Sequence, residues 1–117
     1  MDNSVNKRLC GMLGFAMRAG KLVIGTETVC KAMAKRGKDK PRLVLIAFDA
    51  SDGTKKKLLT KAEFYGVYAI EINIDQSELG RLLGKLYAPA TVAVVDDNFA
   101  EQIRRATDTE DTSGSTN

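Results

Sequence analysis

The fold of this chain is decided by a continuous apolar run, RLVLIAF at residues 42–48, which turn-forming residues bound on both sides. Successive side chains of a strand point to opposite faces of a sheet, so an entirely apolar strand needs cover on both faces. We therefore expect a buried central strand here. Shorter apolar runs at 67–72 and 90–95 predict two more strands, and residues 22–24 predict a short fourth one.

Helical patterns alternate with these strands along the chain. The spacing of Leu9, Leu13 and Ala16 predicts a helix between residues 3 and 20, and further helices are expected near 26–36, 53–65, 75–84 and after Asp96. Such alternation predicts an α/β protein, a three-layer α/β/α sandwich with a short, mostly parallel central sheet. We expect a single domain at residues 1–106 and a disordered acidic tail at 107–117, which is rich in Thr, Ser and Asp.

Positive charge is concentrated in the first half of the chain. Residues 1–61 contain 14 Lys and Arg against 5 Asp and Glu, whereas residues 62–106 contain 4 against 7 and residues 107–117 add three acids. A basic half beside an acidic end favours a polyanionic partner, although lysine-rich faces are also common where they only contact solvent. Charge alone therefore leaves nucleic acid as one of two open interpretations.

The residue types needed for most catalysis are missing. The chain has no His, and no glycine-rich phosphate-binding motif is present. The acidic pairs Asp49/Asp52 and Asp96/Asp97 stand directly before predicted helices, where capping accounts for them. Cys10 and Cys30 lack metal-ligand spacing and read as reduced thiols. We expect no catalytic residue, no cofactor and no metal, and, without a signal peptide or membrane span, a cytoplasmic location.

One backbone feature does suggest a binding site. Gly25 lies between a predicted strand and a predicted helix, where a glycine lets the main chain approach a ligand closely. The first N–H groups of the helix then point outward without partners, and the helix dipole favours a phosphate or a base acceptor there. Lys21, Lys31 and Lys35 would flank this site. The alternative, that Gly25 only serves a tight turn, remains open.

Three motifs occur in the order of a known family: IGTETVCK at 24–31, LIAFDAS at 45–51 and LGRLLG at 79–84. Over residues 5–106 the chain resembles the kink-turn-binding ribosomal protein family, the L7Ae/L30e superfamily. The stretches LGFAMRAGKL at 13–22 and TKKKL at 54–58 are closest to its small bacterial branch of ribosomal or ribosome-associated proteins.

The resemblance implies an α/β/α sandwich without catalytic activity that recognises sharply bent RNA. It implies that tandem G·A pairs at the kink meet the strand-to-helix junction, and that a later loop packs against extruded bases. Well-characterised archaeal and eukaryotic members have Asn then Glu where this chain has Glu27 then Thr28. A carboxylate can only accept hydrogen bonds, whereas an amide also donates. The RNA-binding residues expected on these grounds are Lys21, Gly25, Thr26, Glu27, Thr28, Lys31, Lys35, Arg36, Leu86, Tyr87, Ala88 and Pro89.

The resulting hypothesis is a monomeric, non-enzymatic protein that binds structured, kink-turn-like RNA, such as ribosomal RNA, and is ribosomal or ribosome-associated. The alternative is a ribosome-associated assembly or interaction factor that binds through protein contacts, with the loop at 86–89 as an apolar contact. A third possibility, the substrate-recognition domain of an RNA methyltransferase, would need a cofactor-binding domain after residue 106 and is not expected.

Overall fold

The computed structural model describes residues 4–115, and the side chains of residues 7–107. The α-helices and strands follow the order α1 (Ser4–Arg18), β1 (Leu22–Ile24), α2 (Thr26–Met33), β2 (Leu43–Ala47), α3 (Asp52–Tyr65), β3 (Tyr68–Ile72), α4 (Gln76–Leu82), β4 (Thr91–Val94) and α5 (Asp97–Ser115). A 3-10 turn, η1 (Gly37–Asp39), joins α2 to β2. The alternation of helices and strands expected from the sequence is confirmed, and most boundaries differ by one to three residues.

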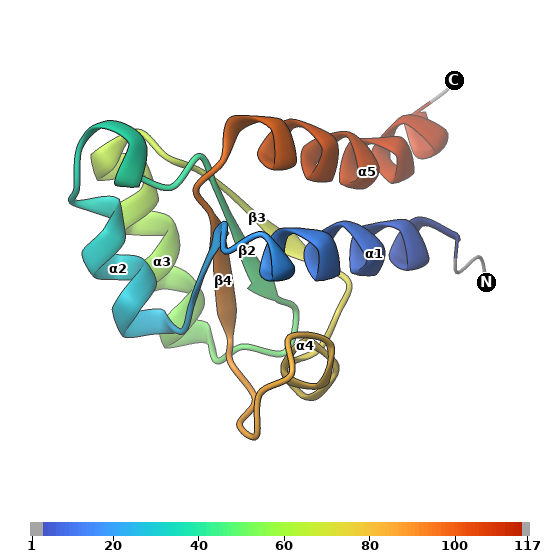
Figure 1. Ribbon diagram of the computed structural model, residues 1–117, viewed down its shortest axis with the longest axis horizontal. Coiled ribbons are helices and arrows are strands. Elements are labelled where there is room, and N and C mark those ends of the chain that lie inside the picture. Colours follow the sequence, from blue (N-terminus) through green and yellow to red (C-terminus); the bar gives the residue numbers. More distant parts are fainter. Residues whose placement is uncertain (1–3, 116–117) are drawn as a thin grey trace.

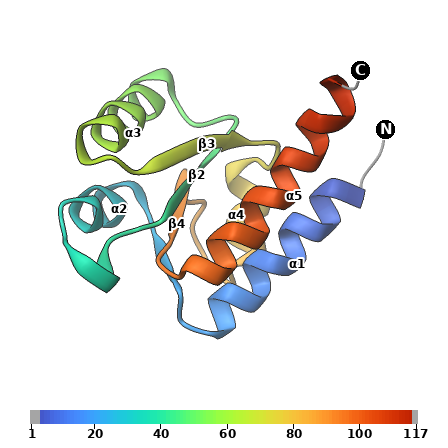
Figure 2. The same cartoon turned by 90° about the horizontal axis from the view of Figure 1, so that it is seen from above.

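The sheet is covered by helices on both faces (Figures 1 and 2). Helices α2 and α3 lie on one face, and α1 and α5 lie on the other. Leu79 and Leu83, in and just after α4, join the core under α1 and α5. Strand β2 is buried at all five positions because it contributes to both cores. Leu43, Leu45 and Ala47 pack toward α1 and α5, whereas Val44 and Ile46 pack toward α2 and α3. This is the doubly covered strand that the apolar run predicts.

The prediction of a mostly parallel sheet is wrong. The strand order is β1-β4-β2-β3, and only β2 and β3 are parallel neighbours, since β4 runs antiparallel to both β1 and β2. The reason lies in α4, which has seven residues and sits at one end of the sheet instead of running back along a face (Figure 1). The chain therefore re-enters the sheet from the end at which β3 leaves it, which makes β4 antiparallel.

This topology brings the ends of several strands and the starts of two helices together. Strands β1, β2 and β3 end, and β4 begins, at one edge of the sheet, which we call the lower edge after its position in Figure 1. Helices α2 and α3 also start there, because each follows a strand that ends there. At the opposite, upper edge β1 and β2 begin, β4 ends and α5 starts.

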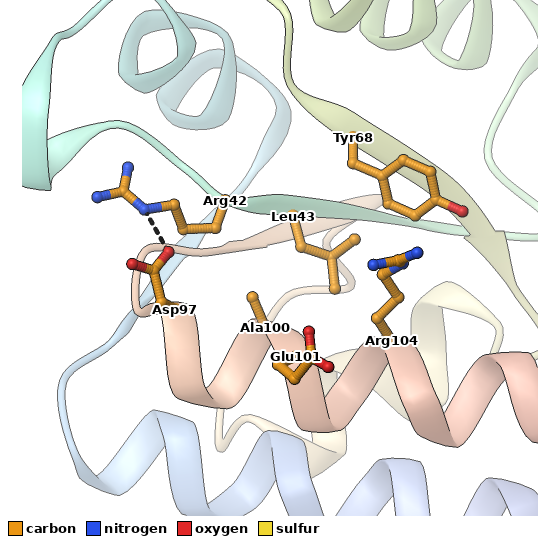
Figure 3. Close-up of a pocket in the computed structure, with 7 residues that line it drawn as sticks. All are labelled: Arg42, Leu43, Tyr68, Asp97, Ala100, Glu101 and Arg104. Atoms are coloured by element: carbon orange, nitrogen blue, oxygen red, sulfur yellow. Dashed lines mark hydrogen bonds and ion pairs between the residues drawn. The ribbon is translucent and has the colours of Figure 1, made fainter.

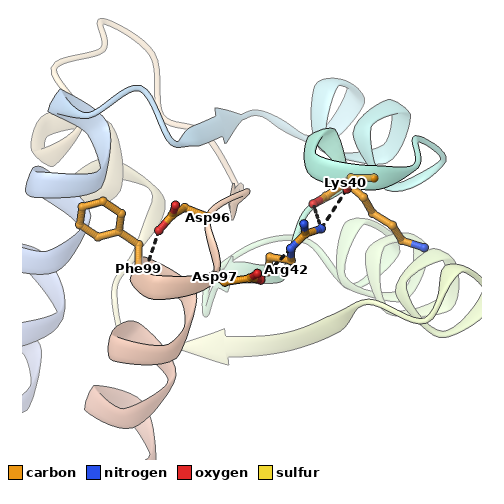
Figure 4. Close-up of polar contacts among 6 residues, drawn as sticks. Lys40, Arg42, Asp96, Asp97 and Phe99 are labelled. Carbon is orange, nitrogen blue, oxygen red and sulfur yellow. Dashed lines mark hydrogen bonds and ion pairs between the residues drawn. The ribbon is translucent and has the colours of Figure 1, made fainter.

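A group of polar contacts closes the upper edge (Figure 4). Arg42 Nε donates to Asp97 Oδ1 at 2.7 Å, and Arg42 Nη1 donates to the carbonyl oxygens of Gly37 and Lys40 at 3.1 and 2.8 Å. Asp96 Oδ2 accepts from the backbone N–H of Phe99 at 2.9 Å. Asp96 is thus a helix cap for α5, as the sequence predicts.

Helix α5 continues to Ser115, beyond the domain boundary at residue 106 that the composition suggests. The side chains of 108–117 lie outside the described residues, and the disordered tail stays a prediction. None of the helices within residues 4–115 combines the length and the apolar character that a membrane span needs.

Candidate nucleic-acid interface

Gly25 has the backbone conformation that the sequence hypothesis requires. Its φ of 101° and ψ of 148° belong to a region that is essentially restricted to glycine. Its N–H donates to the carbonyl of Thr91 at 3.0 Å, and its carbonyl accepts from the N–H of Val29 at 2.9 Å. Gly25 therefore joins the end of β1 to the start of β4 and at the same time begins α2.

The first turn of α2 presents unpaired donors. Gly25 supplies no side-chain cap, and the backbone N–H groups of Thr26, Glu27 and Thr28 have no acceptor among the described residues. The side chains of Glu27 and Thr28 are exposed, whereas Val29 and Cys30 are buried. The outward side of this turn can thus bind an acceptor, and the positive end of the helix dipole lies there.

The loop between α4 and β4 lies at the same edge. Ala47 N donates to the carbonyl of Ala90 at 2.8 Å, which holds the end of the loop against the end of β2. Leu86, Tyr87 and Ala88 are exposed, and Leu86 is fully so, whereas Pro89 is buried. A shallow cavity of about 300 Å³ lies under this loop and is lined by Ser77, Arg81, Lys85, Leu86, Tyr87 and Ala88.

Gly80 determines how closely this loop packs on α4. Gly80 is buried, and a Cβ at this position would lie 2.3 Å from the carbonyl oxygen of Tyr87 and 3.3 Å from Pro89 Cδ. Any side chain would push the loop away from the helix. The LGRLLG motif therefore contains a packing glycine that fixes the main chain of the exposed loop.

The structure brings part of the expected set together at the lower edge. Gly25, Thr26, Glu27 and Thr28 lie there with the loop 86–89. Lys31 follows Thr28 by about one helical turn and is also exposed. Helix α2 then leads away from this edge, so Lys35 and Arg36 lie past its end, close to η1.

Lys21 is at the other edge of the sheet. Its carbonyl accepts from the N–H of Val95 at 3.0 Å, which pairs the start of β1 with the end of β4. It lines an upper-edge cavity of about 640 Å³ together with Lys38, Arg42, Asp39, Asp96 and Asp97, among others. Three cations and three acids line this cavity. Because β1 begins at the upper edge, Lys21 does not belong to the group at the lower edge.

Three residues at the lower edge, Lys57, Phe48 and Asp49, were not among the RNA-binding residues expected from the sequence. Lys57 of α3 forms an ion pair with Glu27, at 3.7 Å between Nζ and Oε2. Phe48, directly after β2, is exposed, and its neighbour Asp49 accepts from the N–H of Gln76 at 2.9 Å. The run of three lysines at 55–57 after the Ser51 cap was the sequence signal that could have indicated Lys57. Which of the three lysines points toward α2 depends on how α2 and α3 pack, and the sequence pattern does not specify this.

A third cavity, of about 460 Å³, lies between the β2–β3 side of the sheet and α5 (Figure 3). Its walls include Arg42, Tyr68, Glu101 and Arg104, and the Arg104 guanidinium lies 5.1 Å from the centre of the Tyr68 ring. Arg42 already forms an ion pair with Asp97 in this cavity. Two arginines and two acids line it, so it is a poorer match for a polyanion than the lower edge.

The two cysteines are unpaired, as expected. Burial raises the pKa of the Cys10 thiol, and the nearby Glu78 carboxylate adds to this effect. A raised pKa lowers the thiolate fraction at neutral pH, so Cys10 is a poor nucleophile. Among the described residues no group of three or more His, Cys, Asp or Glu side chains could hold a metal ion.

The chain thus combines a three-layer α/β/α fold with exposed helix N–H groups and a neighbouring loop at one sheet edge. These features can be compared with known protein families. The model of the ribosomal protein L7Ae/L30e/S12e/Gadd45 family matches residues 7–104. The chain belongs to this family, and the resemblance inferred from the three motifs is confirmed.

Several relatives carry informative names. The chain is 33% identical over 105 residues to the RNA-binding protein YlxQ of Enterococcus faecium, covering 89% of this chain and 95% of that protein. It is 37% identical over 92 residues to RNA-binding protein YlxQ of Bacillus subtilis, covering 79% and 87%. It is 34% identical over 80 residues to the large ribosomal subunit protein eL30 of Sulfurisphaera tokodaii, covering 68% and 73%.

Solved structures share the fold. A Bacillus halodurans protein of unknown function superposes with a TM-score of 0.77 at 32% identity, covering 86% of this chain and 97% of that one. The Giardia lamblia 15.5kD RNA binding protein superposes with a TM-score of 0.71 at 18% identity, covering 93% and 89%. The second match is evidence for the fold alone.

Proposed function

We propose that this chain is a non-enzymatic RNA-binding protein that recognises structured, kink-turn-like RNA through the lower edge of its sheet. The observation that carries the proposal is the first turn of α2, where three backbone N–H groups point outward beside the exposed loop 86–88. The names of the two YlxQ relatives support the choice of RNA as the partner.

The geometry of the lower edge suits an RNA whose bases are partly unstacked. Backbone N–H groups and the hydroxyls of Thr26 and Thr28 can pair with base edges or phosphate oxygens. Tyr87 offers an aromatic surface on which an extruded base can stack, and Leu86 offers an apolar one. A regular A-form duplex keeps its bases stacked and its major-groove base edges inside a deep, narrow groove, so a kinked element is the better match.

Phosphate contacts would come from cations around this edge. Lys31 on α2 is one turn from Thr28, and Arg81 and Lys85 line the cavity under the loop. Lys35 and Arg36 could reach a strand that continues along α2, whereas Lys21, at the upper edge, could contribute only to a longer RNA. Pro89 is buried and would hold the loop in place instead of contacting RNA.

A ribosomal RNA target, association with the ribosome, a monomeric state and a cytoplasmic location remain part of this proposal. The relationship to eL30 of Sulfurisphaera tokodaii supports a ribosomal context. We propose no catalytic residue, cofactor or metal, since the chain has no His and the lower edge needs none to bind RNA.

A gel-shift titration tests the proposal with two RNAs of equal length, one containing a kink-turn and one fully paired. We expect tighter binding of the kinked RNA at about 0.15 M salt, and a steep fall in affinity for both RNAs as salt rises. Equal affinity for the two RNAs, with a shallow salt dependence, would instead support the alternative of a ribosome-associated interaction factor, for which the exposed Leu86 would be a protein contact.

A further inference from the structure

Glu27 is an unusual residue for the centre of an anion-binding surface. It lies in the first turn of α2, between the two threonines of the proposed RNA site, and its side chain is 82% exposed. A carboxylate is favourable beside the positive end of a helix dipole, but it repels phosphate groups. Its effect on RNA binding therefore depends on the charges next to it.

Lys57 supplies the opposite charge from a different element. It lies in the second turn of α3, and its Nζ is 3.7 Å from Glu27 Oε2. Helices α2 and α3 run side by side on the same face of the sheet (Figures 1 and 2). The Lys57 side chain is 45% exposed, so the pair bridges the two helices at the surface.

The fold does not depend on this ion pair. Exposed ion pairs of this kind add little to stability, because both ions remain hydrated and two side chains lose freedom. Helix α3 is already capped by Ser51, whose Oγ accepts from the N–H of Thr54, and α2 and α3 share an apolar core that includes Val29, Met33 and Leu58. The pair therefore has a stronger rationale in binding than in folding.

We propose that Glu27 and Lys57 act as one RNA-contacting unit. Lys57 cancels the repulsion between Glu27 and phosphate, and its ammonium group also donates to a phosphate or base acceptor. Glu27 accepts from an amino or imino group of a base. A donor and an acceptor are thus offered side by side, one from each helix. This inference rests on the proposed function and adds α3 to the RNA site.

A double-mutant cycle tests the unit. The variants are Lys57→Met, Glu27→Gln and the double variant, each titrated with the kinked and the straight RNA. We expect Lys57→Met to lower affinity for kinked RNA about tenfold in the parent, because Glu27 is then uncompensated. In the Glu27→Gln background the same change should cost no more than about threefold.

Lys56→Met is the matched control. Lys56 precedes Lys57 on α3, is exposed, and has no ion-pair partner among the described residues. Lys56→Met removes the same charge from the same helix as Lys57→Met. We expect it to cause a smaller loss of affinity than Lys57→Met, and the same loss in the parent and in the Glu27→Gln background. Thermal unfolding of each variant should match the parent to within about 3 °C, because the altered positions are exposed.

The failures of the two proposals are distinguishable. Equal losses from Lys57→Met in both backgrounds, or a loss no larger than that from Lys56→Met, would overturn the unit even if kinked RNA is still preferred. If the parent shows no preference for kinked RNA but the coupling between Glu27 and Lys57 persists, only the proposed function is overturned. A parent that binds neither RNA would overturn both.

Discussion

Gly80 lies directly under the main chain of Tyr87, so that a Cβ on Gly80 would be 2.3 Å from the Tyr87 carbonyl oxygen. Because that atom belongs to the backbone, a rotamer change cannot relieve the clash. We expect Gly80→Ala to lower the free energy of unfolding by about 1–3 kcal/mol and to weaken RNA binding, since the loop 86–88 must move. Thermal denaturation and gel shift measure the two effects.

Gly11→Ala is the control for this change. Gly11 is on α1, and nothing lies within 4 Å of a Cβ built there. Replacing a helical glycine of this kind should stabilise the protein by up to about 1 kcal/mol. If Gly80→Ala instead unfolds and binds like the parent, the close contact between α4 and the loop is not what holds the loop.

Gly25 is expected to be sensitive for a different reason. A Cβ there meets only Thr28 Oγ1 at 4.0 Å, but its φ of 101° strains any L residue. Gly25→Ala should therefore cost about 1–3 kcal/mol of stability, measured by chemical denaturation. Gly53→Ala, in the first turn of α3 with open space around it, should not be destabilising. Equal stability of the two variants would argue against the strained junction.

Tyr87 tests the loop without altering the fold. Tyr87 is 55% exposed as a residue, so Tyr87→Ala should leave the unfolding temperature unchanged within error. If a base stacks on the ring, the substitution should weaken the free energy of binding to kinked RNA by about 1–3 kcal/mol. Phe15→Ala removes a similarly exposed aromatic ring from α1 and should not alter RNA affinity. Equal effects of the two substitutions would mean that the loop has no special role.

Lys31 and Lys21 separate the two edges of the sheet. Both were predicted from the sequence as phosphate contacts, yet only Lys31 is on the helix that starts at the lower edge. Lys31→Gln should lower affinity for all RNAs and reduce the slope of log affinity against log salt by about 1. Lys21→Gln should leave the slope for a short kinked RNA unchanged. A larger effect of Lys21→Gln would move the binding surface to the upper edge.

The buried elements of this fold were predictable because their signals are local. The apolar run at 42–48 identifies β2, and Gly25, positioned between an apolar strand and a polar first helical turn, identifies the β1–α2 junction. The direction of β4 was not predictable from alternation alone. It depends on whether the chain crosses a face of the sheet or turns at its end, and the short α4 leaves it at the end.

The candidate site was predictable in part for the same reason. Gly25 to Thr28 are adjacent in sequence, so a local motif contains them all. Lys57 joins them only through the packing of α3 on α2, and the separation of Lys21 from them follows from the direction in which β1 runs. Contacts between elements distant in sequence depend on the tertiary fold, which no local pattern in one sequence specifies.

Amide chemical-shift mapping with ¹⁵N-labelled protein and a short kink-turn RNA tests most directly where RNA binds. We predict that the largest shifts fall on Gly25, Thr26, Glu27 and Thr28 and on the loop residues Leu86, Tyr87 and Ala88. Changes concentrated on Lys21, Lys38 and Asn98 at the upper-edge cavity, or no changes at saturating RNA, would contradict the assignment of RNA binding to the lower edge.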